Sequence, residues 1–426
     1  MSKIIQSLRG MNDILPNETP HWQFLENTVR EILSSYAYRE IRFPVVEHTE
    51  LFKRSIGEVT DIVEKEMYSF GGDDHKKYSL RPEGTAGCVR AGISNGLLYN
   101  QTQKLWYMGP MFRHEKPQEG RYRQFHQIGA EAFGFAGPEV DAELIMLTAR
   151  LWKKLGLSPM LEINSIGSSE TRVQYRTALV GYFTSHRDLL DEDSLRRLER
   201  NPMRILDSKI PQTQELVKNA PVLSAFLNQE EQDHFLGLQN LLDDAGITYR
   251  VNPRLVRGLD YYSLTVFEWI TDQLGAQNAI CSGGRYDGLV EQLGGKPCKA
   301  VGWAMGIERV VLLLKQANIQ IPDTHPELYL VLDAAAEVKR AGFQLAEKIR
   351  DGLNGVKLEV YCGHAGFKSQ LKQADKSGAQ FALILGQDEL AKNCISLKNL
   401  RVRSEQESLA FNDIISELCK RLESQS

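Results

Sequence analysis

The chain has 426 residues, of which 42% are apolar and 25% charged, and its formal net charge at pH 7 is −4. This composition is typical of a globular protein with two or three domains, and it excludes a polycation that binds nucleic acids indiscriminately. No apolar run reaches the roughly 18 residues of a membrane span and no apolar signal core opens the chain, so we expect a cytoplasmic protein. The six cysteines lack any Cys-x-x-Cys spacing, which argues against a disulfide framework or a structural zinc site.

The first predicted element is a helix that follows an irregular segment of 18 residues. Thr19 is a plausible N-cap, and Pro20 suits the first helical position. Apolar side chains then recur at steps of three and four from Trp22 to Tyr36, the pattern of an amphipathic helix. Residues 40–47 follow, where Pro44 marks an edge strand or a break.

A β-hairpin is the next predicted element. Residues 105–113 and 121–133 have strand character, and the polar segment 114–120, which contains Pro and Gly, joins them. A helix is expected over 141–155. Over about 168–245 the strand signals vanish and helical periodicity dominates, so we expect a helical insertion.

Strand signals return at 248–254, 265–270 and 300–305, and a helix is expected over 307–317. Residues 318–326 contain two prolines and few apolar residues, which indicates a linker. Beyond it, strands at 328–332, 356–361 and 381–385 alternate with helices at 341–353, 367–376 and 412–422. This alternation predicts a small α/β domain with a largely parallel sheet, whereas the hairpins before the linker indicate an α+β domain.

The first polar cluster lies in the turn of residues 80–85. Glu83, Gly84 and Thr85 present a carboxylate, a bare backbone and a hydroxyl, and Glu83 could hold an ammonium group through charge-assisted hydrogen bonds. The alternative is an ordinary helix N-terminus capped by Thr85, which this cluster taken alone would favour.

The second cluster surrounds the loop of the predicted hairpin. Three arginines and Lys116 flank the loop, and the guanidinium fork matches phosphate oxygens. Phe125 offers a flat face on which a base could stack. The alternative is a solvated charged hairpin, but the interleaved aromatic residues favour a nucleotide site.

Two further features lie on strands. Gln127 and Glu131 are four residues apart and therefore project from the same face, which is either a ligand-binding face or simply the solvated one. Arg309 falls in the first turn of a predicted helix, where the helix dipole disfavours a cation, so a bound anion or a stacked base would explain it. No Gly-x-x-x-x-Gly-Lys phosphate loop occurs.

Arg257–Tyr262 and Ser282–Asp287 are the most informative segments of the chain. Each places glycine, arginine, tyrosine and aspartate together between apolar runs. This chemistry suits a small polar ligand with a charged end and a hydrogen-bonding end. A packing role fits poorly, because buried arginine and aspartate are costly unless they are paired.

These motifs resemble those of class II aminoacyl-tRNA synthetases, subclass IIa. Phe112–Glu115 with the Arg-x-x-x-Phe-x-x-x-Gly of Arg121–Gly129 resembles the second class signature, and Gly302–Arg309 resembles the third. The first helix and Pro44 resemble the first signature, which builds the dimer interface in that class. Arg-Gly-Leu-Asp-Tyr-Tyr and Gly-Gly-Arg-Tyr-Asp resemble the two motifs peculiar to histidyl-tRNA synthetases.

The resemblance covers essentially the whole chain and implies its architecture and reaction. Residues 1–322 would form an α+β catalytic domain built on an antiparallel sheet, with the helical insertion at about 168–245. Residues 327–426 would form an α/β anticodon-binding domain. The implied reaction is ATP-dependent ligation of L-histidine to tRNA(His) through a histidyl-adenylate, with release of AMP and pyrophosphate.

The resemblance also implies roles for individual residues. The catalytic residues would be Arg257 and Arg113. Histidine would be bound by Glu83, Gly84, Thr85, Gln127, Glu131, Tyr261 and Tyr262. ATP would be bound by Arg113, Glu115, Arg121, Phe125 and Arg309, and the tRNA acceptor end by Lys116 and Gln118. Mg²⁺ would arrive with the ATP phosphates, and we expect no prosthetic group, a homodimer and no membrane association.

Two alternatives are a catalytically silent histidine sensor and a non-enzymatic tRNA-binding module. Sensors of this kind typically lack the anticodon domain and erode the Arg-Gly-Leu-Asp-Tyr-Tyr motif, and this chain keeps both. A tRNA-binding module of the kinase-fused kind would carry a fused domain, and no sign of one occurs here. The ligase is therefore the favoured interpretation.

Overall fold

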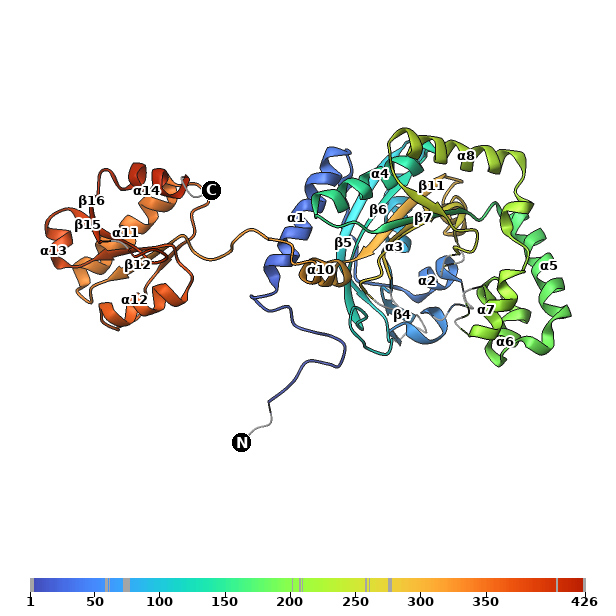
Figure 1. Ribbon diagram of the computed structural model, residues 1–426, viewed down its shortest axis with the longest axis horizontal. Helices are drawn as coiled ribbons and strands as arrows, with labels where there is room; N and C mark the ends of the chain where they lie inside the picture. The colour runs from blue at the N-terminus through green and yellow to red at the C-terminus, as the bar shows by residue number, and fades with distance from the viewer. Residues whose placement is uncertain are drawn as a thin grey trace. The chain divides into compact units, whose positions relative to one another are not determined.

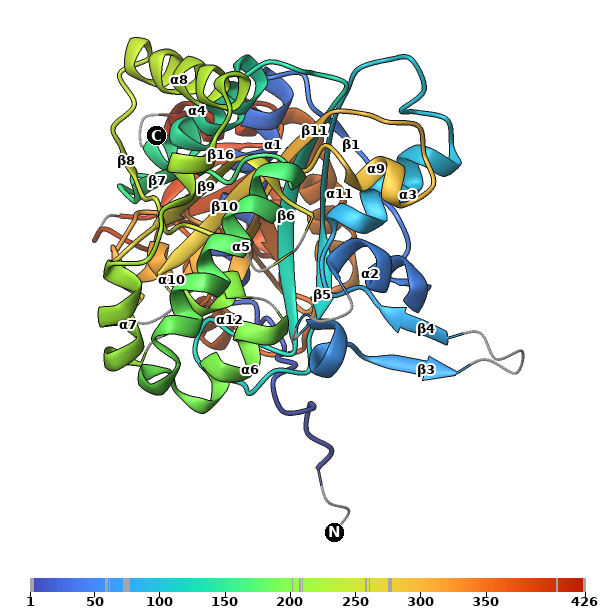
Figure 2. The same cartoon turned by 90° about the vertical axis from the view of Figure 1, so that its right-hand side faces the viewer.

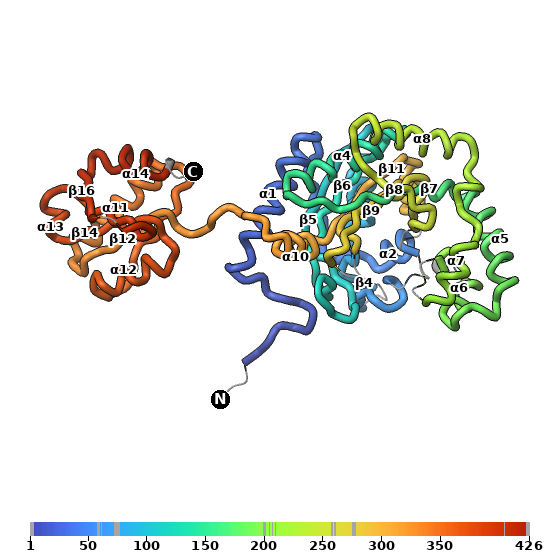
Figure 3. The backbone as a smooth tube through the Cα atoms, in the orientation of Figure 1, coloured from blue at the N-terminus to red at the C-terminus, as the bar shows by residue number. Residues whose placement is uncertain are grey.

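The computed structural model describes residues 4–57, 60, 62–71, 77–200, 202–206, 208, 210–256, 259, 261–274, 278–403 and 405–423. The chain divides into two compact units, Met1–Ile321 and Pro322–Ser426 (Figures 1 and 3). Within the described residues, no helix combines the length and the apolar character that crossing a membrane requires.

An eight-stranded sheet forms the centre of the first unit, with the strand order β1-β5-β6-β11-β10-β9-β7-β8. The inner pairings are all antiparallel, and only the outermost pairs, β1 with β5 and β7 with β8, are parallel. The predicted hairpin is confirmed as β5 and β6. The strands are β1 (Arg39–Glu40), β5 (Gln103–Phe112), β6 (Gln124–Phe133), β7 (Met160–Ser165), β8 (Tyr249–Val251), β9 (Ser263–Ile270), β10 (Ala279–Arg285) and β11 (Ala300–Gly306).

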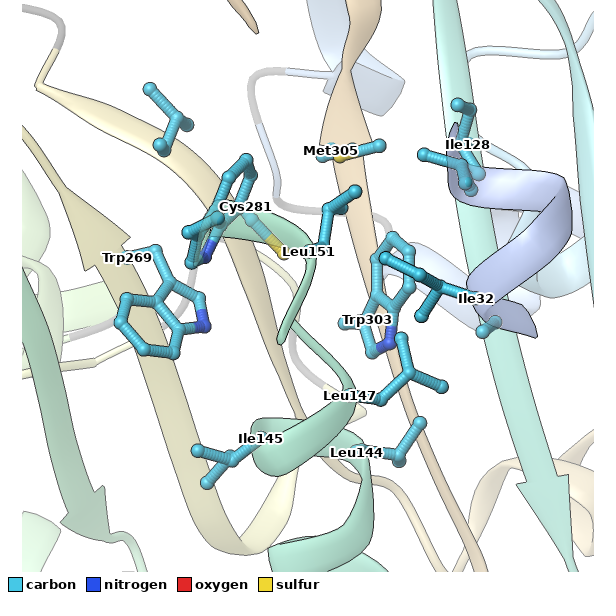
Figure 4. Packing of buried hydrophobic residues seen from close by; sticks show 14 of the residues in the cluster. Ile32, Ile128, Leu144, Ile145, Leu147, Leu151, Trp269, Cys281, Trp303 and Met305 are labelled. Carbon is cyan, nitrogen blue, oxygen red and sulfur yellow. The ribbon is translucent and has the colours of Figure 1, made fainter. Parts of the chain in front are cut away.

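Four helices cover one face of this sheet (Figures 1 and 2). They are α1 (Thr19–Ser35), α4 (Glu139–Lys154), α8 (Gln229–Asp244) and α10 (Ile307–Gln316). Figure 4 shows Leu144 and Leu151 of α4 packed with Ile128, Trp303 and Met305 from the strands. Each fully buried side chain of this size contributes about 1.5–3 kcal/mol through removal of apolar surface from water.

The opposite face of the sheet is formed by residues of the other parity, such as Tyr107, Gly129 and Glu131. Here α3 (Thr85–Ser94) packs through Cys88 and Val89. A small three-stranded sheet precedes this helix, with α2 (Thr49–Ile56) beside it and α9 (Leu289–Gln292) in contact with α2 and α3. Its strands are β2 (Val46–His48), β3 (Ser69–Gly71) and β4 (Lys77–Leu80).

The predicted helical insertion is confirmed, since residues 168–245 contain helices and no strand in their described part. Ser168 caps the first helix by accepting from Thr171 N at 3.3 Å, and Asn228 opens α8 with a capping box completed by Glu231. The helices are α5 (Ser169–Ser185), α6 (Glu192–Arg200), α7 (Pro211–Lys218) and α8, with short 3₁₀ turns between them.

The second unit has a five-stranded sheet in the order β13-β12-β14-β15-β16. The three predicted strands are confirmed as β12 (Leu328–Leu332), β13 (Leu358–Val360) and β14 (Phe381–Leu385), and they pair in parallel. The remaining elements are α11 (Ala336–Gly352), α12 (Phe367–Lys376), α13 (Gln387–Ala391), β15 (Cys394–Asn399), β16 (Glu407–Ala410) and α14 (Ile414–Glu423). The prediction of a largely parallel sheet is wrong, because β15 and β16 add two antiparallel pairings. The two strands bury few large apolar side chains, so their sequence signal is weak.

Two details of the first unit also differ from the prediction. The helix α1 begins at Thr19 itself, whose hydroxyl donates to Pro16 O at 3.3 Å instead of capping the helix. Strand β10 was not expected, because its Ser282-Gly283-Gly284 centre lacks the β-branched residues that signal a strand.

Candidate active site

A cavity of about 230 Å³ opens on the face of the large sheet opposite α1 and α4. Residues from β6, β10, β11 and the start of α10 surround it, together with residues from the segments around Glu83 and Tyr261. The predicted site residues that line it are Glu83, Thr85, Arg113, Glu115, Arg121, Phe125, Gln127, Glu131, Tyr261, Tyr262 and Arg309. The structure therefore brings together residues that are as far as 226 positions apart in the chain, from 83 to 309.

Small residues on neighbouring strands create the hollow. In the register of the sheet, Gly302 lies opposite Glu131 and Gly306 opposite Gln127. A Cβ atom on Gly302 would lie 1.6 Å from Oε2 of Glu131, so only glycine leaves room for that carboxylate. The cavity exists because the side chains of β6 are long and those facing them from β11 are absent or short.

Glu131 is buried at one end of the cavity, with only 1% of its surface exposed. Its Oε1 accepts hydrogen bonds from the hydroxyls of Thr85 at 2.8 Å and Tyr107 at 3.1 Å, and its Oε2 accepts one from Tyr286. Burial raises the pKa of Glu131 to about 8, although these three hydrogen bonds oppose the shift. Glu131 thus makes this end of the cavity a hydrogen-bond acceptor site, and the opposing effects of burial and hydrogen bonding set its charge state.

Glu83 has a structural contact as well as a place in the cavity. Its carboxylate accepts from Thr85 N at 2.6 Å and from Ala86 N at 2.9 Å, which satisfies the first turn of α3. Burial raises the pKa of Glu83. The alternative that Thr85 caps this helix is wrong, because the Thr85 hydroxyl donates to Glu131 instead.

Gln127 presents a buried hydrogen-bond acceptor to the cavity. Its Oε1 is buried and has no hydrogen-bond partner in the described part of the chain. A buried acceptor without a partner costs about 1–3 kcal/mol, so a ligand N–H at this position would recover that energy. The alternative that Gln127 and Glu131 project from a merely solvated face is excluded, since both line the cavity.

Arginines gather at the other end of β6. Arg113 lies over the ring of Phe125, with 5.2 Å from its guanidinium carbon to the ring centroid, and its Nε donates to Pro82 O at 2.9 Å. Burial lowers the pKa of Arg113. Glu115 forms an ion pair with Arg121 and lies 3.9 Å from Arg113.

Arg309, in the first turn of α10, completes this basic end. Its Nε donates to Gly120 O at 3.2 Å and its Nη1 to Ala279 O at 2.7 Å. Burial and the neighbouring charges of Arg121 and Arg113 lower the pKa of Arg309. Three guanidinium groups at one end of a cavity, beside an aromatic ring, suit a polyanion that carries a flat base.

The Arg257–Tyr262 segment is described only in part. Tyr261 and Tyr262 are both 7% exposed, and their ring centroids lie 4.7 Å apart at the cavity wall. Arg257, the predicted catalytic arginine, lies outside the described residues.

Three predicted site residues do not line the cavity. Gly84 lies under the ring of Tyr107, where a Cβ atom would come within 2.1 Å of Cε2. Lys116 and Gln118 are exposed in the β5–β6 loop, where Gln118 pairs with Arg121 through backbone hydrogen bonds at 3.0 and 2.9 Å.

Sequence reasoning missed Tyr107, Tyr286 and Glu308. Tyr286 was visible in the Gly-Gly-Arg-Tyr-Asp motif, but nothing local indicates that its hydroxyl reaches Glu131. For Arg285 the sequence interpretation was wrong in the other direction, because it favoured ligand binding by this segment and considered a packing role a poor fit. That side chain is fully buried, and its Nε lies 2.8 Å from Oδ1 of Asp141, so it is a structural residue.

Comparisons with known proteins show the family to which the chain belongs. A sequence model described as histidyl-tRNA synthetase matches residues 10–310, and one described as anticodon binding domain matches residues 330–421. The apo histidyl-tRNA synthetase of S. aureus is 35% identical, with 97% of this chain and 99% of that chain covered and a TM-score of 0.81.

Two more distant structures share the fold. The histidyl-tRNA synthetase from Nostoc sp. PCC 7120 is 21% identical, with 98% and 100% coverage and a TM-score of 0.70. A Bacillus halodurans protein, described as an ATP phosphoribosyltransferase regulatory subunit/histidyl-tRNA synthetase, is also 21% identical, with 88% and 97% coverage and a TM-score of 0.64. The chain therefore belongs to the histidyl-tRNA synthetase family, the class II ligases that charge tRNA(His) with histidine.

Proposed function

We propose that the cavity described above binds L-histidine at its Glu131 end and ATP at its Arg113 end, and joins them there as histidyl-adenylate. One observation carries this proposal: both groups of residues line the same cavity of about 230 Å³. Along β6, Phe125 and Glu131 are six residues apart, a span of roughly 20 Å at the rise of a β-strand. That span accommodates an amino acid and a nucleotide end to end.

At the histidine end, hydrogen-bonding capacity matches the ligand. Glu83, Thr85 and Gln127 would hold the α-amino group, and the buried Oε1 of Gln127 is suited to accept one of its N–H groups. Glu131 and Tyr262 would bind the two imidazole nitrogens, with Tyr261 at the wall. An analogue that lacks a ring N–H would leave buried polar groups unpaired, which lowers specificity constants by about 10⁴–10⁵ in such sites.

At the nucleotide end, the arginines supply charge and the aromatic ring supplies a stacking surface. Arg113 would contact the α-phosphate, and Phe125 and Arg309 would enclose the adenine. Arg121 would hold the outer phosphates, which requires it to exchange its ion pair with Glu115 for the ligand. Arg257 would stabilise the reacting carboxylate and α-phosphate, an assignment that depends on the sequence motif alone.

The chemistry needs positioning and charge stabilisation more than acid–base groups. A carboxylate oxygen of histidine attacks the α-phosphorus, the bond to the bridging oxygen breaks, and pyrophosphate leaves. A terminal ribose hydroxyl of the tRNA then attacks the carbonyl carbon, loses its proton, and displaces AMP. Arg113 would stabilise the charge that develops on the α-phosphate in both steps.

Magnesium would enter with the ATP phosphates. Among the described residues, no group of three histidine, cysteine, aspartate or glutamate side chains is arranged to hold a metal ion. Mg²⁺ prefers phosphate oxygens and water to dedicated protein cages. When bound, the ion would neutralise phosphate charge.

The tRNA contacts are proposed from position. Lys116 and Gln118 are exposed on the loop that also carries Arg121, so they could contact the acceptor end while the loop covers ATP. The matched anticodon-binding region, residues 330–421, would bind the other end of the tRNA. By likeness to the family, we further propose a homodimer in the cytoplasm, for which analytical ultracentrifugation is the direct test of assembly.

The deciding experiment is histidine-dependent exchange of labelled pyrophosphate into ATP, with magnesium and without tRNA. We expect exchange with histidine alone among the amino acids, and its loss in Arg113→Ala and Arg257→Ala. Arg54→Ala is the matched control, since its side chain is 58% exposed in a surface ion pair. Histidine binding without exchange in the wild-type protein would contradict the proposal and indicate a histidine sensor.

A further inference from the structure

Glu131 receives hydroxyl donors from three separate elements. Thr85 reaches it from α3, Tyr107 from β5, and Tyr286 from the residue directly after β10. An ionised carboxylate offers about four acceptor positions, and these donors take three of them. One position remains, on Oε2, for a donor that enters the cavity.

Tyr107 differs from the other two donors because it is not part of the cavity wall. Its side chain is 2% exposed and is absent from the residues that line the cavity. The ring lies in a slot between two glycines: a Cβ atom would lie 2.1 Å from its Cε2 at Gly84, and 2.4 Å from its hydroxyl oxygen at Gly129.

Neither glycine is required by its backbone conformation. Gly84 has φ −102°, and Gly129 is not among the glycines with positive φ. Other residues could adopt such a backbone, so the shape of the Tyr107 ring is what excludes a side chain at both positions. Two glycines thus admit a tyrosine whose hydroxyl reaches Glu131.

We propose that Tyr107 is a positioning residue for histidine selection, whose hydroxyl orients the Glu131 carboxylate and favours its ionised form, so that it accepts an N–H of the imidazole ring. The inference rests on the proposed assignment of Glu131 to the imidazole. Tyr107 itself touches no substrate and acts through Glu131.

Electrostatics explain how the Tyr107 hydroxyl, which lies outside the cavity wall, affects the charge state of Glu131. Burial raises the pKa of Glu131, and each hydrogen bond to the charged form lowers it. Removal of the Tyr107 hydroxyl would therefore raise that pKa further and protonate more of the carboxylate near neutral pH. The other titratable groups that face Glu131 are Tyr38, Glu83, Cys88, Tyr261 and Tyr286.

The test is Tyr107→Phe in the full-length protein, assayed by pyrophosphate exchange from pH 6 to 9. Phenylalanine keeps the ring between the glycines and removes only the hydroxyl. We expect the KM for histidine to rise about 10-fold, in line with loss of a hydrogen bond to a charged group. The KM for ATP and kcat should stay within about twofold, and the acidic limb of kcat/KM for histidine should move to higher pH.

Tyr175→Phe is the matched control. Tyr175 is also 2% exposed, but its hydroxyl donates to Pro221 O at 3.0 Å, in the helical insertion. Its removal should leave the pH profile unchanged. The inference would be overturned if the acidic limb does not shift in Tyr107→Phe. It would also be overturned if the KM values for histidine and ATP rise equally and kcat falls to the same extent.

Glu131→Gln separates this inference from the proposed function. If Glu131→Gln leaves the KM for histidine unchanged, the assignment of Glu131 to the imidazole fails. If Glu131→Gln raises that KM and Tyr107→Phe does not, the assignment of Glu131 stands and only the role of Tyr107 is lost.

Discussion

At the scale of single residues, Glu131 combines two conflicting requirements. Its proposed role of binding the imidazole needs a charged acceptor, whereas its burial disfavours charge. Folding raises the pKa of this carboxyl from 4.5 to about 8. The ionised form of Glu131 therefore destabilises the folded state. A carboxyl whose pKa is raised by folding stabilises the fold below its solvated pKa, and this stabilisation is lost as the pH rises through the folded pKa.

Glu131→Gln should therefore gain stability relative to wild type as the pH rises from about 4.5 to about 8, because the amide never ionises. The difference in free energy of unfolding should change by at most about 1.4 kcal/mol per pH unit in that window and level off above it. Urea unfolding of both proteins from pH 5 to 9, without ligands, measures this. A pH-independent difference would show that Glu131 is already ionised across the window.

At the scale of elements, the carboxylate of Glu308 on α10 bonds to strand β6 beside the proposed adenine site. Glu308 accepts from His126 N at 2.9 and 3.0 Å, and lies 3.0 Å from Nδ1 of the same residue. Each of these residues is the direct neighbour of one that encloses the proposed adenine site, Phe125 or Arg309. The contact between Glu308 and His126 therefore fixes the distance between Phe125 and Arg309.

Loss of the Glu308–His126 contact should weaken the binding of ATP more than the binding of histidine. Glu308→Ala should raise the KM for ATP about tenfold, the effect of losing hydrogen bonds to a charged group, with the KM for histidine within about twofold. Pyrophosphate exchange with each substrate varied in turn gives both constants. Glu291→Ala, an exposed carboxylate on α9, serves as control. Equal increases in both KM values would instead indicate a general loosening of the sheet.

Arg285 links α4 to the end of β10. Both Arg285 and Asp141 are fully buried, and Thr265 and His234 also bond to the aspartate at 2.6 and 2.9 Å. Arg285→Ala would leave a buried charge without its partner, and should lower the free energy of unfolding by about 3–5 kcal/mol.

The control for this stability prediction is Arg54→Ala, which breaks an exposed ion pair on α2 and should cost about 0.3–0.5 kcal/mol. Urea unfolding at neutral pH compares the two variants. Similar small losses in both would mean that the buried pair contributes no more than a surface pair.

The sequence predicted the features that have a local pattern, and it did not predict the contacts between residues that are distant in the chain. Helices with a regular apolar stripe, such as α12, and apolar strands, such as β14, were predicted at their observed bounds. The even spacing of Gln127 and Glu131 correctly placed both on one face. The partners of Arg285 and Glu131 could not be predicted, because Asp141 and Tyr107 are distant from them in sequence. Packing of α4 on the sheet brings Asp141 to Arg285, and the register of β5 with β6 brings Tyr107 to Glu131.

At the scale of the whole molecule, the second unit carries its own hydrophobic core. Leu328, Leu330 and Leu383 from the sheet pack with Ile349 of α11 and Leu418 of α14, all of them buried. All the cavity-lining residues of the candidate active site, in contrast, lie before Ile321. The two units thus separate the proposed activation chemistry from the matched anticodon-binding region.

Removal of residues 322–426 should therefore separate the two half-reactions. We expect pyrophosphate exchange to stay within about threefold of the full-length value, because the proposed activation site uses only groups of the first unit. Charging of tRNA(His) should fall by about 100-fold or more, since the contacts that hold the tRNA far from its acceptor end are gone. Residues 322–426 expressed alone should unfold cooperatively in urea, as expected of a unit with its own core. A truncated chain that folds, by the same unfolding assay, yet activates no histidine would contradict this division of labour, because activation would then depend on the second unit.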